Sequence, residues 1–379
     1  MDNTMGWNTI IGQERVKNLL RRSIERGQLA HAYLFYGIRG VGKQATAIEF
    51  ARTILCLSSK SEACGECASC RKTALLQHPD LSLIIPLPVG KGEKTGDDPI
   101  NSLEEDQIQT IRQQIALKSE NPYYEIQIPK SNFIKINSVR NLKRISSLTS
   151  VEGSWKIFLI CDADKMNAEA SNSLLKTLEE PGDKTLLVLT TSEKDRLLPT
   201  IISRCQLVQF SPLTDQEIAT ALQEREHVPP DESMLAAKIA QGSYVVASEL
   251  LSENLSAERK EVLDFIRVSL GWKEISRVDL IDELASSKDR NSIEHWLNVL
   301  QSWLRDAMVL RDARDSMALG AANDKEMQSF VQKFPKANIE QAIHSVETCI
   351  ALVRKNVYLH LLLTTLSFDL KRTLAESIS

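Results

Sequence analysis

The 379-residue sequence predicts an α/β domain with a mostly parallel sheet, followed by a region made of helices alone. Up to residue 212, short apolar runs alternate with segments of helical periodicity, which is the pattern of a parallel sheet covered by helices. The run "HAYLFYG" leads into the glycine-rich stretch "GIRGVGKQ" and then into a helical segment. After Pro212 the strand pattern ends, and helical patterns continue to Ser379.

The elements follow in order along the α/β part. "IIGQERVKNLLRRSIERGQ" predicts a helix with basic residues on its outer side, "HAYLFYG" a buried strand, and "KQATAIEFARTILC" the next helix. "WKIFLICDAD" predicts a second strand that ends in acidic residues, and "NAEASNSLLKTLEEP" a helix stopped by Pro181. "KTLLVLTTS" predicts a third strand. "LLPTIISRCQLVQFSPL" predicts a short helix, a turn and a fourth strand.

We expect three domains: an α/β domain at 1–212, a small helical domain at 213–252 and a larger helical domain at 253–379. The α/β domain contains a cysteine module at 56–70 and an insertion at about 85–130. "PLPVGKGEKTGDDPINSLEED" in this insertion is rich in Pro, Gly and charge, which predicts an exposed, solvated elaboration. "LEEDQIQTIRQQIALKS" after it is compatible with a helix.

Composition excludes some classes of protein. Hydrophobic residues make up 42% and charged residues 25%, as in ordinary globular proteins. The net charge of −4 gives no overall attraction to nucleic acid, so a DNA-facing surface would have to be local. The N-terminus does not read as a signal peptide, and the apolar stretch "NVYLHLLLTTLSF" is too short to span a bilayer. We therefore expect no membrane association and a cytoplasmic location.

The stretch "GIRGVGKQ" matches the phosphate-binding loop G-x-x-x-x-G-K-[ST] except at its last position. Gly37, Gly40 and Gly42 would let backbone N–H groups approach a phosphate, and Lys43 would neutralise its charge. Gln44 stands where a Ser or Thr hydroxyl normally holds magnesium. The alternative is a glycine turn without a ligand, which the strand before the loop and the helix after it disfavour.

Hydrolysis of a nucleotide needs acidic residues as well as the loop. Asp162, at the end of "IFLICDAD", is placed to orient magnesium, but Ala163 stands where a second acid would position water. Asp164 is one position further and would point the other way on a strand. Gln44 and Ala163 are therefore two independent losses, which favour a retired active site. The sequence leaves open whether ATP or ADP still binds.

Four of the seven cysteines lie close together with the spacing C-x7-C-x2-C-x2-C. They are Cys56, Cys64, Cys67 and Cys70. The C-x2-C spacing lets two thiolates bind one zinc ion without strain, and Cys56 supplies the fourth ligand. The sequence therefore predicts a structural zinc site, with unliganded thiols as the alternative.

Arg204, in "SRC", follows a short apolar helix and precedes a strand. By itself it is most simply read as a surface residue or as a helix C-cap. Its residue type and position alone do not assign it a function.

Together, "IIGQ", "HAYLFYGIRGVGK", "CGECASC", "SLLKTLEEP" and "SRC" resemble the clamp-loader subunits of bacterial DNA polymerase III, which are AAA+ proteins. The resemblance covers roughly residues 7–250 with specific motifs and extends more loosely to the end. It implies that 1–212 is an AAA+ domain, that 213–252 is its helical lid, and that 253–379 is an oligomerisation collar.

The family has an ATPase branch, gamma/tau, and a delta prime branch that resembles it without hydrolysing ATP in well-known cases. Gln44 and Ala163 depart from the ATPase pattern. The stretch "QGSYVVASELL" has Val245 and Val246 where the ATPase branch carries an arginine, and "HPDL" after the cysteines looks like delta prime. The resemblance therefore indicates the delta prime branch.

In this family the "SRC" arginine points at the ATP of a neighbouring subunit, so the resemblance implies that Arg204 is an arginine finger acting in trans. It further implies a hetero-oligomer with a gamma/tau-type ATPase and the delta subunit, which loads the sliding clamp onto primer-template DNA within the polymerase holoenzyme. One alternative is a gamma/tau-like active ATPase with a divergent phosphate loop. Another is an AAA+ scaffold outside replication.

Overall fold

The computed structural model describes residues 6–375 except 60, 95, 153–154, 253–254, 272–273, 313–324 and 356. The chain divides into two compact units. The first, here called the sheet unit, comprises Met1–Glu217 and Gly242–Val245, and the second, the helical unit, comprises Ile218–Gln241 and Val246–Ser379. The three domain boundaries expected from the sequence stay a prediction.

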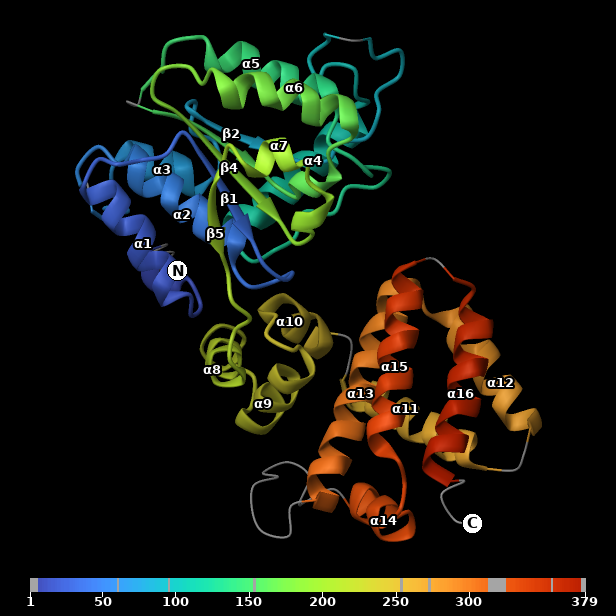
Figure 1. Cartoon of the computed structure of the whole chain (residues 1–379). Coiled ribbons are helices and arrows are strands. Elements are labelled where there is room, and N and C mark those ends of the chain that lie inside the picture. Colours follow the sequence, from blue (N-terminus) through green and yellow to red (C-terminus); the bar gives the residue numbers. More distant parts are fainter. Residues whose placement is uncertain are drawn as a thin grey trace. The chain divides into compact units, whose positions relative to one another are not determined.

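Five strands form one parallel sheet in the order β2-β3-β4-β1-β5 (Figure 1). The strands are β1 (Ala32–Tyr36), β2 (Leu81–Ile84), β3 (Lys156–Ile160), β4 (Thr185–Thr191) and β5 (Gln206–Gln209). Leu34 of β1 lies opposite Leu189 of β4 and Leu207 of β5. Because the strands are parallel, the loops that follow β1, β3 and β4 meet at one edge of the sheet.

Helices cover both faces of the sheet. One face carries α1 (Glu14–Glu25) and α2 (Lys43–Leu55), and α3 (Ala68–Ala74) packs on α2. The other carries α5 (Ile136–Ser146), α6 (Ala168–Glu179) and α7 (Pro199–Ile202). Side chains alternate along β1: Tyr33 and Phe35 join the core under α1 and α2, and Ala32 and Leu34 join the core under α5 and α6. Buried apolar side chains on both faces make β1 the centre of the unit.

The structure corrects two sequence-based expectations. The sequence pattern predicts four strands, and β2 is a fifth. It was missed because "LSLI" has four residues, of which Ser82 is polar and half-buried. The insertion, expected to be exposed, is exposed only in part. Ile85, Leu87, Leu103 and Ile111 are buried in an apolar cluster of their own.

The insertion also contains the expected helix, α4 (Glu105–Glu120). A buried ion pair ties its loop to α5, because Lys135 Nζ lies 2.8 Å from Glu93 Oε2 and each side chain is 5% exposed. Asn137 donates to the same carboxylate at 2.9 Å. The insertion is therefore packed against the sheet unit and is not a loose loop.

The rest of the described chain is helical, as expected. The helices are α8 (Asp215–Glu226), α9 (Pro230–Ile239), α10 (Tyr244–Ser252), α11 (Leu255–Leu270), α12 (Glu274–Ser287), α13 (Arg290–Asp312), α14 (Lys325–Lys333), α15 (Ile339–Arg354) and α16 (Leu359–Ala375). Thr214 caps α8, because its hydroxyl accepts from the N–H of Glu217 at 3.2 Å. Trp296 and Leu300 of α13 are fully buried. Within the described residues, every helix is too short or too polar to span a lipid bilayer.

Candidate functional site

The phosphate loop lies between β1 and the N-terminus of α2, at the edge of the sheet where β3 and β4 also end. Gly40 and Gly42 adopt φ angles of 77° and 95°, which side chains rarely tolerate. A Cβ on Gly40 would lie 2.1 Å from Ser243 Oγ, and one on Gly37 would lie 2.5 Å from the Phe210 carbonyl oxygen. The loop therefore keeps the glycine-dependent shape that the sequence predicted.

Lys43 is turned back onto its own loop. Its Nζ donates to the Gly37 carbonyl at 2.8 Å, the Ile38 carbonyl at 2.7 Å and Ser192 Oγ at 3.0 Å. Burial lowers the pKa of Lys43 to about 8, although nearby Asp162 acts in the opposite direction. An ammonium group has three donors, and here all three are used within the protein.

The place of the magnesium hydroxyl is occupied by an amide. Gln44 Nε2 donates to Asp162 Oδ1 at 3.4 Å, and Lys165 Nζ lies 3.0 Å from Asp162 Oδ2. Both oxygens of the carboxylate are thus engaged by side chains of the same chain. A divalent cation at this position would have to compete with the positive charge of Lys165.

The second acid of a hydrolytic site is absent from its expected place. Ala163 is fully buried, and it begins a short 3₁₀ helix, Ala163–Lys165, directly after β3. Asp164 lies on this turn and accepts from Thr191 Oγ1 at 2.6 Å. The sequence pattern predicts that Asp164 continues the strand, but the residue lies on the 3₁₀ turn. Its actual place on the turn leaves it bonded to the end of β4.

A tyrosine from the segment after α4 covers the loop, and sequence reasoning missed it. The Tyr123 hydroxyl accepts from the backbone N–H of Ile11 at 2.8 Å, and a Cβ on Gly42 would lie 2.8 Å from that hydroxyl. The Tyr123 ring packs edge-on against Tyr244, with 5.0 Å between ring centroids. The remaining cavity at the loop measures about 40 Å³. That is room for a few water molecules, at about 10–15 Å³ each.

Lys118 supports this cover from α4. Its side chain is almost fully buried, and Nζ donates to the Tyr124 carbonyl at 2.6 Å. Burial lowers the pKa of Lys118 to about 8. The bond fixes the chain direction just beyond Tyr123, because it joins the last turn of α4 to the segment that follows it. The only sequence signal for this cover was the tyrosine pair in "NPYYE".

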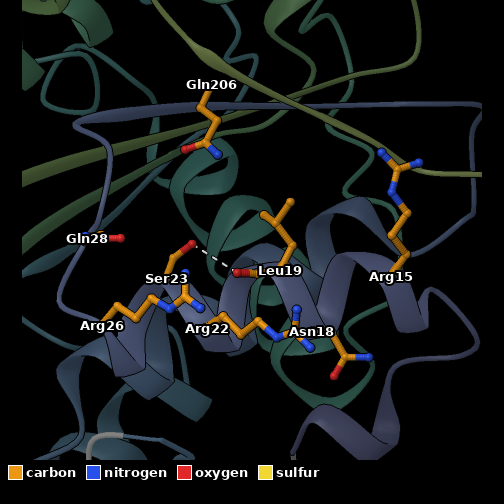
Figure 2. Close-up of a pocket in the computed structure, with 8 residues that line it drawn as sticks. All are labelled: Arg15, Asn18, Leu19, Arg22, Ser23, Arg26, Gln28 and Gln206. Atoms are coloured by element: carbon orange, nitrogen blue, oxygen red, sulfur yellow. Dashed lines mark hydrogen bonds between the residues drawn. The ribbon is translucent and has the colours of Figure 1, made fainter.

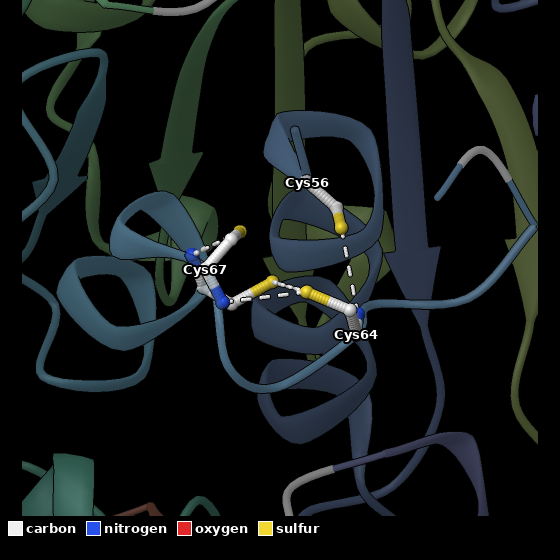
Figure 3. Close-up of side chains that lie close together, drawn as sticks. Cys56, Cys64 and Cys67 are labelled. Carbon is white, nitrogen blue, oxygen red and sulfur yellow. Dashed lines mark hydrogen bonds between the residues drawn. The ribbon is translucent and has the colours of Figure 1, made fainter. Parts of the chain in front are cut away.

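The four predicted cysteines come together. Cys56 ends α2, Cys67 caps the N-terminus of α3, and Cys70 lies within α3. All four sulfur atoms lie within 4.8 Å of one another, and Cys64 Sγ is 3.9 Å from Cys70 Sγ. Figure 3 shows Cys56, Cys64 and Cys67 with their side chains turned toward one another. Four thiolates around zinc, with Zn–S bonds of about 2.3 Å, would have sulfur atoms about 3.8 Å apart.

Hydrogen bonds from backbone N–H groups to the sulfur atoms favour the thiolate form, which is the form that binds a cation. The N–H groups of Cys64, Cys67 and Cys70 each donate to a neighbouring cysteine sulfur at 3.4 Å. The N–H of Cys67 is the main cause that lowers the pKa of the Cys64 thiol to about 6. Burial raises the pKa of the Cys70 thiol, so this thiol would need a bound cation to ionise. The cluster is compatible with a structural zinc site formed by the four sulfur atoms.

Arg204 lies just beyond α7 on the surface of the sheet unit, with 35% of its side chain exposed. Its Nη2 is 2.8 Å from Glu179 Oε1 at the end of α6, and its Nη1 donates to the Thr200 carbonyl at 2.9 Å. The guanidinium is held in a defined direction. Arg204 lies 160 residues beyond Gln44 of the phosphate loop in the sequence and does not line the cavity at that loop.

The strand order, the loop between β1 and α2 and the helices on both faces of the sheet define an α/β protein of the phosphate-loop type, with an added four-cysteine cluster and a helical C-terminal region. A family model described as "DNA polymerase III, delta subunit" matches residues 12–214, more than half of the chain. The chain belongs to this family.

Curated relatives agree with this assignment. DNA polymerase III subunit delta' of Bacillus subtilis is 35% identical over 224 residues, which span 59% of this chain and 55% of the relative. The delta' subunit of Pseudomonas aeruginosa is 32% identical over 247 residues, 64% of this chain and 62% of the relative. The tau/gamma subunit of Haemophilus influenzae is 26% identical over 259 residues, 67% of this chain and 31% of the relative. The matches thus span less than two thirds of each relative.

Proposed function

We propose that the chain is a delta prime-type subunit of the clamp loader of bacterial DNA polymerase III. In this proposal it assembles in the cytoplasm with a gamma/tau-type ATPase and the delta subunit, and it helps to load the sliding clamp onto primed DNA. Membership of the family and the two delta' relatives support this assignment. The chain has no independent ATPase activity in this proposal, although it is part of a DNA polymerase holoenzyme.

The proposed loss of ATP hydrolysis is supported mainly by one observation, which is that side chains of this chain fill the phosphate loop. Lys43 is bonded to the loop carbonyls, and Gln44 and Lys165 engage Asp162. Tyr123 lies over Gly42. A nucleotide would have to displace the tyrosine and turn the lysine before it could bind. Even then, Ala163 offers no group to position water.

The proposal gives Arg204 a role in trans. The chain lacks the groups needed to hydrolyse a nucleotide at its own phosphate loop, yet Arg204 is partly exposed and its guanidinium is oriented by Glu179. A guanidinium is always charged and matches phosphate oxygens in a fork, so it suits the nucleotide of a neighbouring ATPase. We propose a structural role for zinc at the cysteines, since the cluster lies beyond the far end of α2 from the phosphate loop.

The test is to purify the chain with its native partners and to measure ATP turnover by the isolated chain. We expect gamma/tau-type and delta subunits in the complex, and no turnover above that of a Lys43→Ala control. Turnover comparable with an active ATPase, abolished by Lys43→Ala, would instead indicate a gamma/tau-like subunit. Failure to associate with any clamp-loader subunit would indicate a scaffold with another role.

A further inference from the structure

A second cavity in the sheet unit lies between α1 and the edge strand β5, and the proposed function does not use it. It measures about 520 Å³, much more than the space at the phosphate loop. Its lining is strongly basic: Arg15 and Arg22 belong to α1, Arg26 caps the C-terminus of that helix, and Gln206 belongs to β5. Figure 2 shows the three arginines along one helix, with Gln206 on the strand across the groove. We call this cavity the arginine groove.

Helical geometry aligns the three arginines. They occupy positions i, i+7 and i+11, which lie within about 40° of one another at 3.6 residues per turn. The opposite side of α1 is anchored in the core by Val16 and Leu20. With a rise of 1.5 Å per residue, the row from Arg15 to Arg26 extends for roughly 16 Å.

The positive charge of this row is not compensated within the part of the chain that the structure describes. Lys17 and Arg21 of the same helix are paired with Glu14 and Glu62. No carboxylate among the described residues forms an ion pair with the groove arginines. Three like charges along one exposed face repel one another, so the groove favours a bound anion. The chain's net charge of −4 makes this a local feature.

We propose that the arginine groove binds the phosphodiester backbone of nucleic acid. A row of about 16 Å is too long for one phosphate group and corresponds to several nucleotides of a strand, at about 3.4 Å each along a duplex. Asn18, Gln28 and Gln206 add amide donors beside the arginines. Leu19 is the one apolar residue among the lining residues that the structure describes, and this lining lacks the apolar and aromatic centre of a protein interface.

The same lining predicts how nucleic acid is bound. Among the described residues, no aromatic side chain lines the groove, so the described lining offers no surface on which bases could stack. The contacts are to phosphates, and binding is therefore independent of sequence and sensitive to salt. This inference goes beyond the proposed function, in which DNA is reached through the assembled complex, and it does not depend on that function.

The test measures binding of the full-length chain alone to a fluorescent 25-bp duplex of mixed sequence, between 50 and 200 mM salt. The variant combines Arg15→Gln, Arg22→Gln and Arg26→Gln. The control combines Lys333→Gln, Lys336→Gln and Lys355→Gln, which removes three exposed charges from the helical unit. Glutamine has a helix propensity close to that of arginine, so circular dichroism should show both variants folded.

We expect the groove variant to weaken binding at least about tenfold at low salt and to make the slope of log K against log salt shallower by up to about 2.7, since each phosphate contact contributes about 0.9. The control should retain the wild-type slope. An unchanged slope in the folded groove variant, or no binding by the wild type, would overturn the proposal. Displacement of the duplex by an equal charge of polyglutamate would assign the groove to acidic proteins instead.

Discussion

Tyr123 is the residue on which closure of the phosphate loop depends most directly. Its hydroxyl accepts from Ile11 N–H and lies against Gly42, so one side chain bonds to the start of the chain and covers the loop. Tyr123 covers the loop from a separate segment of the chain. Its contribution to closure can therefore be tested by a substitution that leaves Lys43 and Asp162 unchanged.

We expect Tyr123→Ala to bind ADP at least about tenfold more tightly than the wild type, a gain of about 1.4 kcal/mol. The free energy of unfolding should fall by about 3 kcal/mol because a buried ring is lost. Isothermal titration calorimetry measures the affinity for ADP, and denaturant unfolding without ADP measures the change in the free energy of unfolding. Tyr124→Ala is the matched control, since that neighbouring hydroxyl is directed to Gln114. Equal affinity in all three proteins would show that the ring does not limit access.

Arg204 gives the second prediction at this scale. In the proposed clamp-loader complex, Arg204→Ala should leave assembly intact, because one side chain is a small part of a subunit interface. Clamp loading should fall strongly, since arginine fingers elsewhere contribute ~10³ or more in rate. Total ATP turnover should fall less, because only the site that faces this subunit loses its arginine.

Lysine at this position would keep the charge without the fork, so Arg204→Lys should restore loading only in part. Arg196→Ala, at a nearby exposed arginine, is the control and should behave as the wild type. Normal loading by an intact Arg204→Ala complex would show that Arg204 is an ordinary surface residue.

At the scale of elements, the cysteine cluster joins the end of α2 to the start of α3. We expect about one zinc ion per chain by elemental analysis. Cys70→Ser should lower zinc content and the melting temperature together, because it removes one of the four proposed zinc ligands, which lies buried within α3. Cys349→Ser, at a buried cysteine of α15, should leave zinc unchanged. Fully folded, metal-free wild-type protein would contradict a structural role.

Helix α4 gives a pH prediction through Lys118. Its folded-state pKa is lowered by burial from 10.5 to about 8, so the folded chain binds fewer protons than the unfolded chain between these values. The lowered pKa of Lys118 therefore contributes stability to the folded chain that is fully present above pH 10.5 and is lost as the pH falls through 8. The full size of this contribution is about 3 kcal/mol, at about 1.36 kcal/mol per pKa unit.

Denaturant unfolding at several pH values should show this effect as a difference between the wild type and Lys118→Met. The wild type should gain stability relative to the variant as pH rises from 8 to 10.5. Because both proteins contain the same cysteines, taking the difference between their free energies of unfolding removes the contribution of the cysteines to the pH dependence. If the difference in the free energy of unfolding between the two proteins does not change with pH, folding does not lower the pKa of Lys118.

The sequence predicted the regular elements well, because strands such as β1 and β3 are buried on both faces and appear as continuous apolar runs. It also predicted that the four cysteines come together, which the structure confirms, and it gave Lys43 and Gln44 roles at the phosphate loop that stay a prediction. It did not identify Tyr123, which reaches Gly42 from 81 positions further along the chain. Such a contact depends on how the insertion packs, and its Pro- and Gly-rich composition suggested an exposed loop.

For the whole molecule, the family match covers the sheet unit, and the role of the helical unit remains a proposal. If 253–379 is a collar that binds other subunits, it should offer an apolar surface. Tyr358, Leu361 and Phe368 are exposed by 67%, 61% and 53% on one side of α16 and the residue before it. Their spacing places them on one helical face.

We therefore expect Leu361→Asp to weaken assembly of the complex at least about tenfold, because a charge would be buried in an apolar contact. Analytical ultracentrifugation with the partner subunits measures this. Val309→Asp, at an exposed apolar residue of α13, should assemble normally. Unchanged assembly by Leu361→Asp would mean that the collar uses another surface.

The position of β5 has a consequence for the behaviour of the chain at high concentration. β5 is the last strand of the sheet, and Gln206 and Leu207 on it are exposed. An open strand edge can pair with the same edge of another copy, and short strands beside positive charge reduce this risk. β5 has four residues, and Gln206 at its start lines the arginine groove. The charge of Arg15, Arg22 and Arg26 should therefore also protect the chain against aggregation.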